Sequence, residues 1–277
     1  MKKTTKSNDS GAKEEIKTHK VNESKTSAAN INDEKTQLTE INKIFKTLMH
    51  FPASTFSDLW DKSIESNKFN YYLKKLETDG LIEKKNGKYS LTVKGKSAST
   101  TVSGETGKEE KRPAVTLLLV IRRKAKKANT HDYVLYKRFK EPYYGHCGFP
   151  GAKMKRGEEI LESAERELME ETGLNGKGIG KIVCIQNGHV INDGELFHHM
   201  LQFVILFDDP KGELVKENRE GTYEWATKDE ILRQEDLFPD IPGVIEEVES
   251  GKFGVKEIKF LQKNQRFVGI ESRHVHK

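Results

Sequence analysis

The chain has 277 residues, of which 34% are hydrophobic and 33% are charged, and its formal net charge is +5. The charged fraction exceeds the roughly 25% of an ordinary soluble domain, and the length allows two domains. The longest apolar run, Val115–Ile121, is too short to cross a bilayer, and no apolar segment follows the N-terminal cations. Cys147 and Cys184 form no disulfide framework. We therefore expect no membrane partner, reduced thiols and a cytoplasmic protein.

Residues 1–34 consist mostly of Lys, Ser, Thr, Asn and Glu, with almost no aromatic or large aliphatic side chains. Such a segment cannot bury enough apolar surface to offset the entropy lost on folding. We expect a disordered tail over residues 1–34.

Residues 35–96 have the pattern of a small, mainly helical domain. A first helix that stops at Pro52 is predicted by helical spacing of the apolar residues Leu38, Ile41, Ile44, Phe45 and Leu48. A short second helix with Ser54 as N-cap and a third helix that ends at Gly80 follow. Asn86-Gly87, between two alternating runs, then predicts a tight hairpin.

Three helices followed by a hairpin resemble the winged helix-turn-helix of small bacterial and archaeal regulators. In that arrangement the third helix and the hairpin contact the groove and the backbone of double-stranded DNA. The resemblance implies these DNA-contacting residues: Lys68, Asn70, Tyr71, Lys74, Lys75 and Lys88. Winged helices also serve as dimerisation or docking modules, so a protein partner is the alternative.

The stretch "GKSASTTVSGETGKEEKRP" is polar and rich in small residues, and it predicts a linker over residues 97–112. A second domain is expected over residues 113–277. Within it, "AVTLLLVIRR", "DYVLYKRF", "KIVCIQNGHVI" and "HHMLQFVILFDD" predict strands, and "KDEILRQEDL" begins a helical end. The final "IESRHVHK" is expected to be mobile.

Between the second and third of these strands lies an acidic helix within Gly151–Leu174. Its residues Glu167, Glu170 and Glu171 share one face, because residues three and four apart are neighbours on a helix. An apolar stripe for packing against the core is predicted from Leu161, Ala164 and Leu168. Crowded carboxylates favour a hard divalent cation such as Mg²⁺, whereas a solvated acidic helix is the alternative interpretation.

The spacing of the whole segment resembles the signature of the Nudix hydrolases, G-x5-E-x7-R-E-U-x-E-E-x-G-U, in which U is a bulky aliphatic residue. Every fixed position matches except the first, where Ala152 replaces Gly. The resemblance implies an α/β fold, an αβα sandwich with a mixed sheet, in the second domain. It also implies cleavage of a diphosphate linkage, usually in a nucleoside compound, with Mg²⁺ or Mn²⁺ as cofactor.

Carried over position by position, the resemblance assigns roles to the helix and to the loop before it. The implied metal ligands are Glu167, Glu170, Glu171 and the carbonyl of Gly151. Arg166 and Glu158 are implied as a pair that orients the helix and the loop, since a guanidinium forks onto a carboxylate. The expected catalytic set consists of the five side chains of Glu158, Arg166, Glu167, Glu170 and Glu171. A later loop is expected to add the metal ligand Glu220, with Glu224 as its competitor, and which carboxylate activates water stays open.

The substrate is expected to be read by residues upstream of the acidic helix. In "KRFKEPYYGHCGFPG", Arg138 is a candidate for phosphate and Tyr144 for stacking on a base, whereas Phe149 is expected to pack in the core. His198 and His199 are not expected to share a metal, because neighbouring residues of a strand point to opposite faces.

Two functions remain. The first is a metal-dependent hydrolase of a nucleotide-type substrate with an attached DNA-binding module, and the second is a transcription regulator whose Nudix domain senses a nucleotide metabolite. The complete acidic signature favours the first. The sequence leaves the oligomeric state open, with a homodimer as one option.

Overall fold

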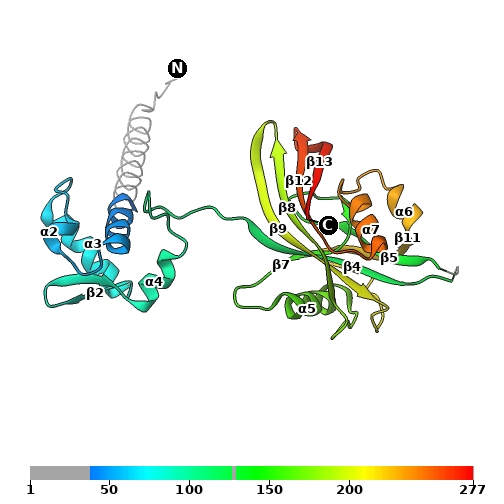
Figure 1. Ribbon diagram of the computed structural model, residues 1–277, viewed down its shortest axis with the longest axis horizontal. Helices are drawn as coiled ribbons and strands as arrows, with labels where there is room; N and C mark the ends of the chain where they lie inside the picture. The colour runs from blue at the N-terminus through cyan, green and yellow to red at the C-terminus, as the bar shows by residue number, and fades with distance from the viewer. Residues whose placement is uncertain (1–37, 127–128, 277) are drawn as a thin grey trace, which may run out of the picture. The chain divides into compact units, whose positions relative to one another are not determined.

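The computed structural model describes residues 38–126 and 129–276. The chain divides into two compact units, Met1–Lys111 and Arg112–Lys277 (Figure 1). The tail expected over residues 1–34 lies outside the described residues.

The N-terminal unit begins, within its described part, with a helix over residues 38–50. It continues with β1 (Ser54–Thr55), α2 (Phe56–Leu59), α3 (Ser66–Thr78), β2 (Ile82–Lys85), β3 (Lys88–Leu91) and α4 (Val93–Ser99). The three strands form an antiparallel sheet in the order β1-β3-β2. Asn86 and Gly87 join β2 to β3 with φ angles of 51° and 76°, as a two-residue hairpin turn requires.

Two details of this unit differ from the sequence prediction. The N-cap of α2 is Thr55, which exchanges hydrogen bonds with Asp58 in a capping box, while Ser54 belongs to β1. The expected linker over residues 97–112 is wrong in its first part, because α4 runs through that boundary to Ser99 and packs on the unit. A Cβ on Gly95 would lie 1.9 Å from the carbonyl oxygen of Leu81, which shows how closely α4 approaches the neighbouring chain.

The C-terminal unit is built on one mixed sheet. Its strands are β4 (Ala114–Lys124), β5 (His131–Arg138), β6 (Cys147–Gly148), β7 (Gly151–Lys153), β8 (Lys181–Asn192), β9 (Glu195–Asp208), β10 (Glu217–Asn218), β11 (Gly221–Thr227), β12 (Gly254–Lys263) and β13 (Arg266–His276). The order is β10-β11-β5-β4-β9-β8-β12-β13, with β6 beside β5 and β7 beside β4. β4 with β9 and β12 with β8 are parallel, and the other pairs are antiparallel.

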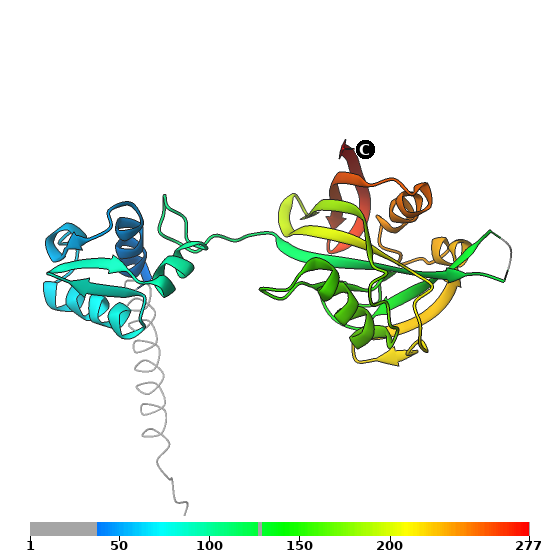
Figure 2. The same cartoon turned by 60° about the horizontal axis from the view of Figure 1, so that its bottom comes forward.

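Helices cover both faces of this sheet, with α5 (Ile160–Thr172) on one side and α7 (Ile241–Ser250) on the other (Figures 1 and 2). Alternation along β4 explains the two layers, because Leu118 and Val120 join the core under α7 while Leu117 and Leu119 join the core under α5. A short helix, α6 (Lys228–Leu232), follows β11. The mixed sheet between helices is the expected α/β architecture.

The apolar stripe of α5 is shifted from the predicted one. Ala164 and Leu168 are fully buried, but Leu161 is 38% exposed, and Ile160 packs against the core. Ile160, Ala164 and Leu168 lie four residues apart, so they form the buried row of the helix.

The end of the chain also differs from expectation. The helical end is only α6 and α7, after which the chain forms β12 and β13, and the segment predicted to be mobile pairs with β12 as part of β13. Cys147 and Cys184 are buried free thiols. No helix among the described residues is long and apolar enough to span a membrane.

Candidate functional site

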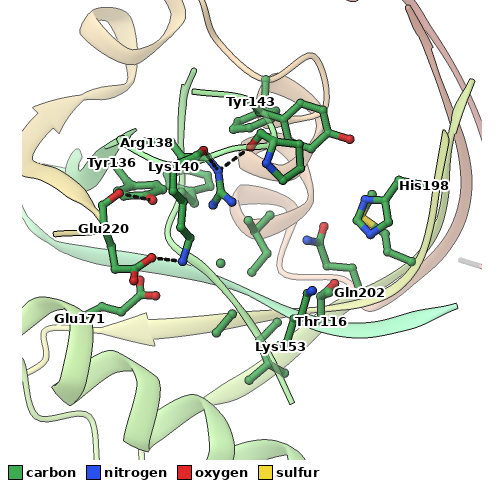
Figure 3. Close-up of a pocket in the computed structure, with 18 of the residues that line it drawn as sticks. Thr116, Tyr136, Arg138, Lys140, Tyr143, Lys153, Glu171, His198, Gln202 and Glu220 are labelled. Atoms are coloured by element: carbon green, nitrogen blue, oxygen red, sulfur yellow. Dashed lines mark hydrogen bonds and ion pairs between the residues drawn. The ribbon is translucent and has the colours of Figure 1, made fainter. Parts of the chain in front are cut away.

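A cavity of about 1050 Å³ opens in the C-terminal unit, and residues of α5, β4, β7, β9 and the β12–β13 hairpin line it (Figure 3). One end is ionic, with the carboxylates Glu167, Glu170, Glu171 and Glu220 beside the cations Arg138, Lys140 and Arg219. The other end is aromatic, with Tyr143, Phe197, Phe238, Phe260 and Phe267. The cavity therefore combines charged and apolar side chains, as small-molecule sites commonly do.

The C-terminal cap of α5 and the buried row of this helix position the acidic residues. The helix stops at Gly173, whose φ of 72° is left-handed and whose N–H donates to the carbonyl of Met169 at 3.0 Å. Burial of Ala164 and Leu168 fixes the rotation of the helix against the sheet. As a result, Glu167, Glu170 and Glu171 all line the cavity.

Arg166 ties α5 to the loop before it. Its Nε donates to Oε1 of Glu158 and its Nη2 to Oε2 of Glu158, each at 2.8 Å, and Ser163 Oγ donates to Oε2 of Glu158 at 2.7 Å. These hydrogen bonds, led by those from Arg166, lower the pKa of Glu158 to about 2. Glu158 is therefore ionised over the physiological range and holds the turn between β7 and the helix.

The third nitrogen of the same guanidinium reaches the carboxylate face. Nη1 of Arg166 donates to Glu167 Oε1 at 2.6 Å and to Glu170 Oε2 at 3.1 Å. Glu171 follows on the same face of α5, lines the cavity and is only partly exposed. Burial, followed by the charge of Glu167, raises the pKa of Glu171 to about 7. Glu171 is therefore protonated in part of the population near neutral pH, because burial and a neighbouring negative charge both disfavour the carboxylate form.

The carboxylates of the cavity have the chemistry of a divalent-metal site without a ready coordination geometry. Across residues 38–126 and 129–276, no three His, Cys, Asp or Glu side chains stand in an arrangement that could hold an ion as they lie. The expected ligands Gly151, Glu167, Glu170, Glu171 and Glu220 share the cavity but not a ready coordination shell, because Arg166 and Lys140 occupy several of the carboxylates. By chemistry the set fits a hard cation, since every donor is an oxygen and its four carboxylates line one cavity.

Glu220 stands opposite α5 on the loop before β11. Its backbone carbonyl accepts hydrogen bonds from Tyr136 Oη and from the N–H of Phe139, both at 2.9 Å, and its carboxylate pairs with Lys140. Figure 3 shows the carboxylates of Glu220 and Glu171 near each other, with Lys140 extending towards Glu220. Its competitor Glu224 is exposed on β11 and does not line the cavity.

The two expected substrate residues have different outcomes. Arg138 lines the cavity, where its Nε donates to the carbonyls of Lys140 at 2.9 Å and Pro142 at 2.7 Å, so it also shapes that loop. Tyr144 is 62% exposed, stacks on Phe139 and lies outside the cavity lining, and its stacking on a base stays a prediction. The backbone of Tyr143 has a φ of 73°, and it is Tyr143 that turns into the cavity.

Residues of the central strands complete the cavity. His198, Met200 and Gln202 alternate along β9 and line it together, and Thr116 of β4 is the register partner of both Gln202 and Lys153. His199 points away and stacks on His189, with ring centroids 4.2 Å apart, as the opposite-face argument requires. The period-two pattern of β9 is the signal that could have assigned His198 and Gln202 to one face.

Asp240 is a further lining residue that the sequence did not single out. It directly precedes α7 and is 9% exposed. Burial raises its pKa to about 6. Its carboxyl group is consequently protonated in part of the population near neutral pH, so it can donate or accept a hydrogen bond at the cavity wall.

The residues expected to contact DNA lie on α3 and on the hairpin of the N-terminal unit. Along α3, Lys68, Tyr71 and Lys74 are exposed, and Asn70 and Lys75 are partly exposed. Lys88 is exposed at the start of β3. The opposite side of α3 is buried through Phe69, Tyr72, Leu73 and Leu76.

Comparisons with known proteins bear on the C-terminal unit. The family model described as NUDIX domain matches residues 110–248 of this chain, and the matched region ends before β12. The uncharacterized Nudix hydrolase YvcI of Bacillus subtilis (strain 168) is 29% identical over 107 residues. The match covers 37% of this chain and spans 63% of the length of that relative.

Among solved structures, the mMutator MutT protein from Bacillus halodurans aligns with a TM-score of 0.47 and 22% identity, covering 57% of this chain and 97% of that chain. The NUDIX domain of Shewanella oneidensis NrtR, complexed with ADP ribose, aligns with a TM-score of 0.42 and 16% identity. That alignment covers 51% of this chain and 89% of the other.

Proposed function

Because the chain belongs to the Nudix family, we propose that its C-terminal unit hydrolyses a pyrophosphate bond in a nucleoside diphosphate-linked compound. The observation that carries the proposal is the single cavity into which α5 turns Glu167, Glu170 and Glu171, facing Glu220 and the cations Arg138 and Lys140. A diphosphate needs both charges there, since cations hold its oxygens and carboxylates serve metal binding and proton transfer.

Mg²⁺ or Mn²⁺ held by Gly151, Glu167, Glu170 and Glu171, with Glu220 from the facing loop, would supply charge neutralisation and a more acidic water. The side chains of this unit supply the positioning, the proton acceptor and the contact with phosphate. Arg166 keeps α5 in register with the loop of Glu158. Glu171 is the candidate general base in this proposal: it lines the cavity, and before a metal ion binds, burial and the charge of Glu167 raise its pKa to about 7. Lys140 sits where a phosphate oxygen would meet the carboxylates.

A substrate panel tests this proposal. The full chain is incubated with nucleoside triphosphates, ADP-ribose, dinucleoside polyphosphates and sugar nucleotides in the presence of Mg²⁺ or Mn²⁺, and released phosphate products are quantified. We expect turnover of at least one compound, and a loss of roughly 10²- to 10⁴-fold in Glu171→Gln, the range for removal of a general base. Glu167→Gln should lose turnover as well.

Glu162→Gln provides the matched control, because Glu162 is exposed on α5 and does not line the cavity. Full activity in Glu171→Gln and Glu167→Gln would overturn the assignment of these carboxylates. A wild-type chain that binds a nucleotide without cleaving any compound of the panel would favour the alternative, a regulator that senses a nucleotide metabolite.

We further propose that the N-terminal unit is a winged helix that binds double-stranded DNA. Its element order, helix, strand, helix, helix and hairpin, supports this, as does the outward side of α3, where Tyr71 and Lys74 are exposed and Lys75 is partly exposed. A recognition helix needs such an outward polar and basic side, because the phosphate backbone supplies most of the affinity. Lys88 in the hairpin adds a cation in the element that would meet the adjacent backbone.

A further inference from the structure

The β12–β13 hairpin contributes to the cavity although it lies beyond the region that the family model matches. β12 pairs in parallel with β8, and this register sets Phe260 beside Val190, both of which line the cavity. β13 then returns antiparallel to β12 and brings Phe267 to the same cavity. The hairpin at the edge of the sheet therefore supplies two of the aromatic residues that line the cavity, Phe260 and Phe267.

Phe267 packs against several other rings of the cluster. Its ring centroid lies 5.6 Å from that of Tyr143, 5.4 Å from that of His146 and 6.0 Å from that of Phe238. Unlike Phe260, which is 6% exposed, Phe267 is only partly buried, so part of its surface is accessible. Partly covered rings at 5–6 Å from each other offer faces and edges against which another flat ring can pack.

Polar groups line the same cavity. Thr116, Gln202 and Lys153 are adjacent through the pairing of β4 with β9 and β7, and Figure 3 shows their side chains together on one side of the cavity. Asp240 lines the wall near Phe238. A purely apolar ligand would leave such groups without hydrogen bonds, whereas a heteroaromatic ring satisfies both, because it has a flat apolar face and a polar edge.

We propose that the β12–β13 hairpin is the specificity element of this site, with Phe267 as one wall of a subsite for the nucleobase of the substrate. The inference rests on the proposed nucleotide substrate and adds which part of the chain selects it. In this arrangement α5 holds the diphosphate at one end of the cavity, and the hairpin holds the ring at the other. Phe267 is a specificity-determining residue that contacts the base and not the bond that is cleaved.

Calorimetric titration without divalent ions tests the subsite independently of turnover. The probes are AMP, GMP, CMP and UMP, with ribose 5-phosphate as the base-free control. We expect the wild type to bind at least one nucleotide about tenfold or more tightly than ribose 5-phosphate, in line with the contribution of stacking on one aromatic ring. Phe267→Ala should reduce this preference to less than threefold, and Phe267→Tyr should retain it.

Two further variants separate stacking from folding. Phe267→Leu keeps apolar volume in the cluster but removes the ring, so it should lose the preference at an unchanged melting temperature. Val268→Ala changes the next residue of β13, which is 66% exposed and does not line the cavity, and should behave as the wild type. Equal affinity of the wild type for nucleotides and ribose 5-phosphate would overturn the inference, as would full preference in Phe267→Leu and Phe267→Ala.

Turnover distinguishes this failure from failure of the proposed hydrolysis. One outcome is that the wild type cleaves a compound, Glu171→Gln loses this activity, and the KM is the same in wild type and Phe267→Ala. That outcome refutes the base subsite and leaves the proposed hydrolysis in place. A base-dependent affinity that Phe267→Ala abolishes, in a chain that cleaves no compound, refutes hydrolysis alone and leaves the subsite in place.

Discussion

Arg166 and Glu158 face each other through two parallel hydrogen bonds, both 2.8 Å long, which join α5 to the loop before it. The remaining Nη1 group of Arg166 holds Glu167 and Glu170. One guanidinium therefore fixes both the position of the helix and the orientation of two carboxylates. Lysine cannot reproduce this fork, because its ammonium is a single point of charge.

The first prediction concerns that fork. Arg166→Lys should weaken Mn²⁺ binding by roughly 10- to 100-fold, the usual effect of losing a group that orients metal ligands. Binding is measured by the paramagnetic signal of free Mn²⁺, with Glu162→Gln as the control on the same helix. Unchanged Mn²⁺ affinity in Arg166→Lys would show that the carboxylates are oriented by something else.

The second prediction is a pH dependence of stability. Burial and the charge of Glu167 raise the pKa of Glu171 to about 7 from a usual value of 4.5, so the unfolded chain releases this proton at lower pH than the folded one. The wild type should therefore lose stability relative to Glu171→Gln as the pH rises from about 4.5 to 7, and the difference should be constant above that window. At 1.36 kcal/mol per pKa unit, the difference approaches about 3 kcal/mol at pH 8.

Urea denaturation in EDTA at several pH values measures this difference. Glu170→Gln is the control, because Glu170 lies on the same face of α5 but its side chain is 56% exposed. Addition of Mg²⁺ should reduce the gap for Glu171→Gln by stabilising the wild type. A gap that is independent of pH would mean that Glu171 ionises normally in the folded protein.

The third prediction tests the N-terminal unit. Replacing Lys74 and Lys75 together by alanine should weaken duplex DNA binding and reduce the slope of log affinity against log salt by about one for each lysine that contacts a phosphate. The charge-matched control replaces Lys96 and Lys108, which are exposed on other elements of the unit. Fluorescence anisotropy over a range of salt concentrations gives the slopes, and equal slopes for the two double variants would contradict a DNA-contacting α3.

The fourth prediction tests the packing of α4. Gly95→Ala should destabilise the N-terminal unit by about 1–3 kcal/mol or more, because a Cβ there meets the backbone of Leu81 and the clash outweighs the better helix propensity of alanine. Gly87→Ala isolates the cost of backbone conformation alone, since its φ is 76° and no atom lies within 4 Å of its Cβ. Both are compared by chemical denaturation. A neutral or stabilising Gly95→Ala would show that α4 does not pack as described.

Local patterns carried most of what the sequence predicted. The apolar runs of β4 and β5, the Asn86-Gly87 hairpin and the acidic spacing of α5 are each contained in a short window of the sequence. The family match also confirms the Nudix domain that the spacing of Glu158, Arg166 and Glu171 indicated.

The aromatic end of the cavity was missed because it is not local. It joins Tyr143, Phe238 and Phe267, which the chain brings together only through the parallel pairing of β12 with β8. Burial alternates along "GVKEIKFLQK" in the structure, but the buried positions include Lys256 and Gln262, so the apolar residues give only a weak strand signal. Even a clear strand pattern gives no information on which neighbour the strand will pair with.

Placement of the acidic row on α5 and of the aromatic wall on β12–β13 separates two kinds of evolutionary freedom. Substitutions in the hairpin alter the shape of one wall while the carboxylates stay fixed by Arg166 and by the buried row of the helix. Ligand preference can therefore change during evolution while the carboxylates of α5 stay the same. Substitutions in α5, by contrast, affect these carboxylates whichever ligand occupies the cavity.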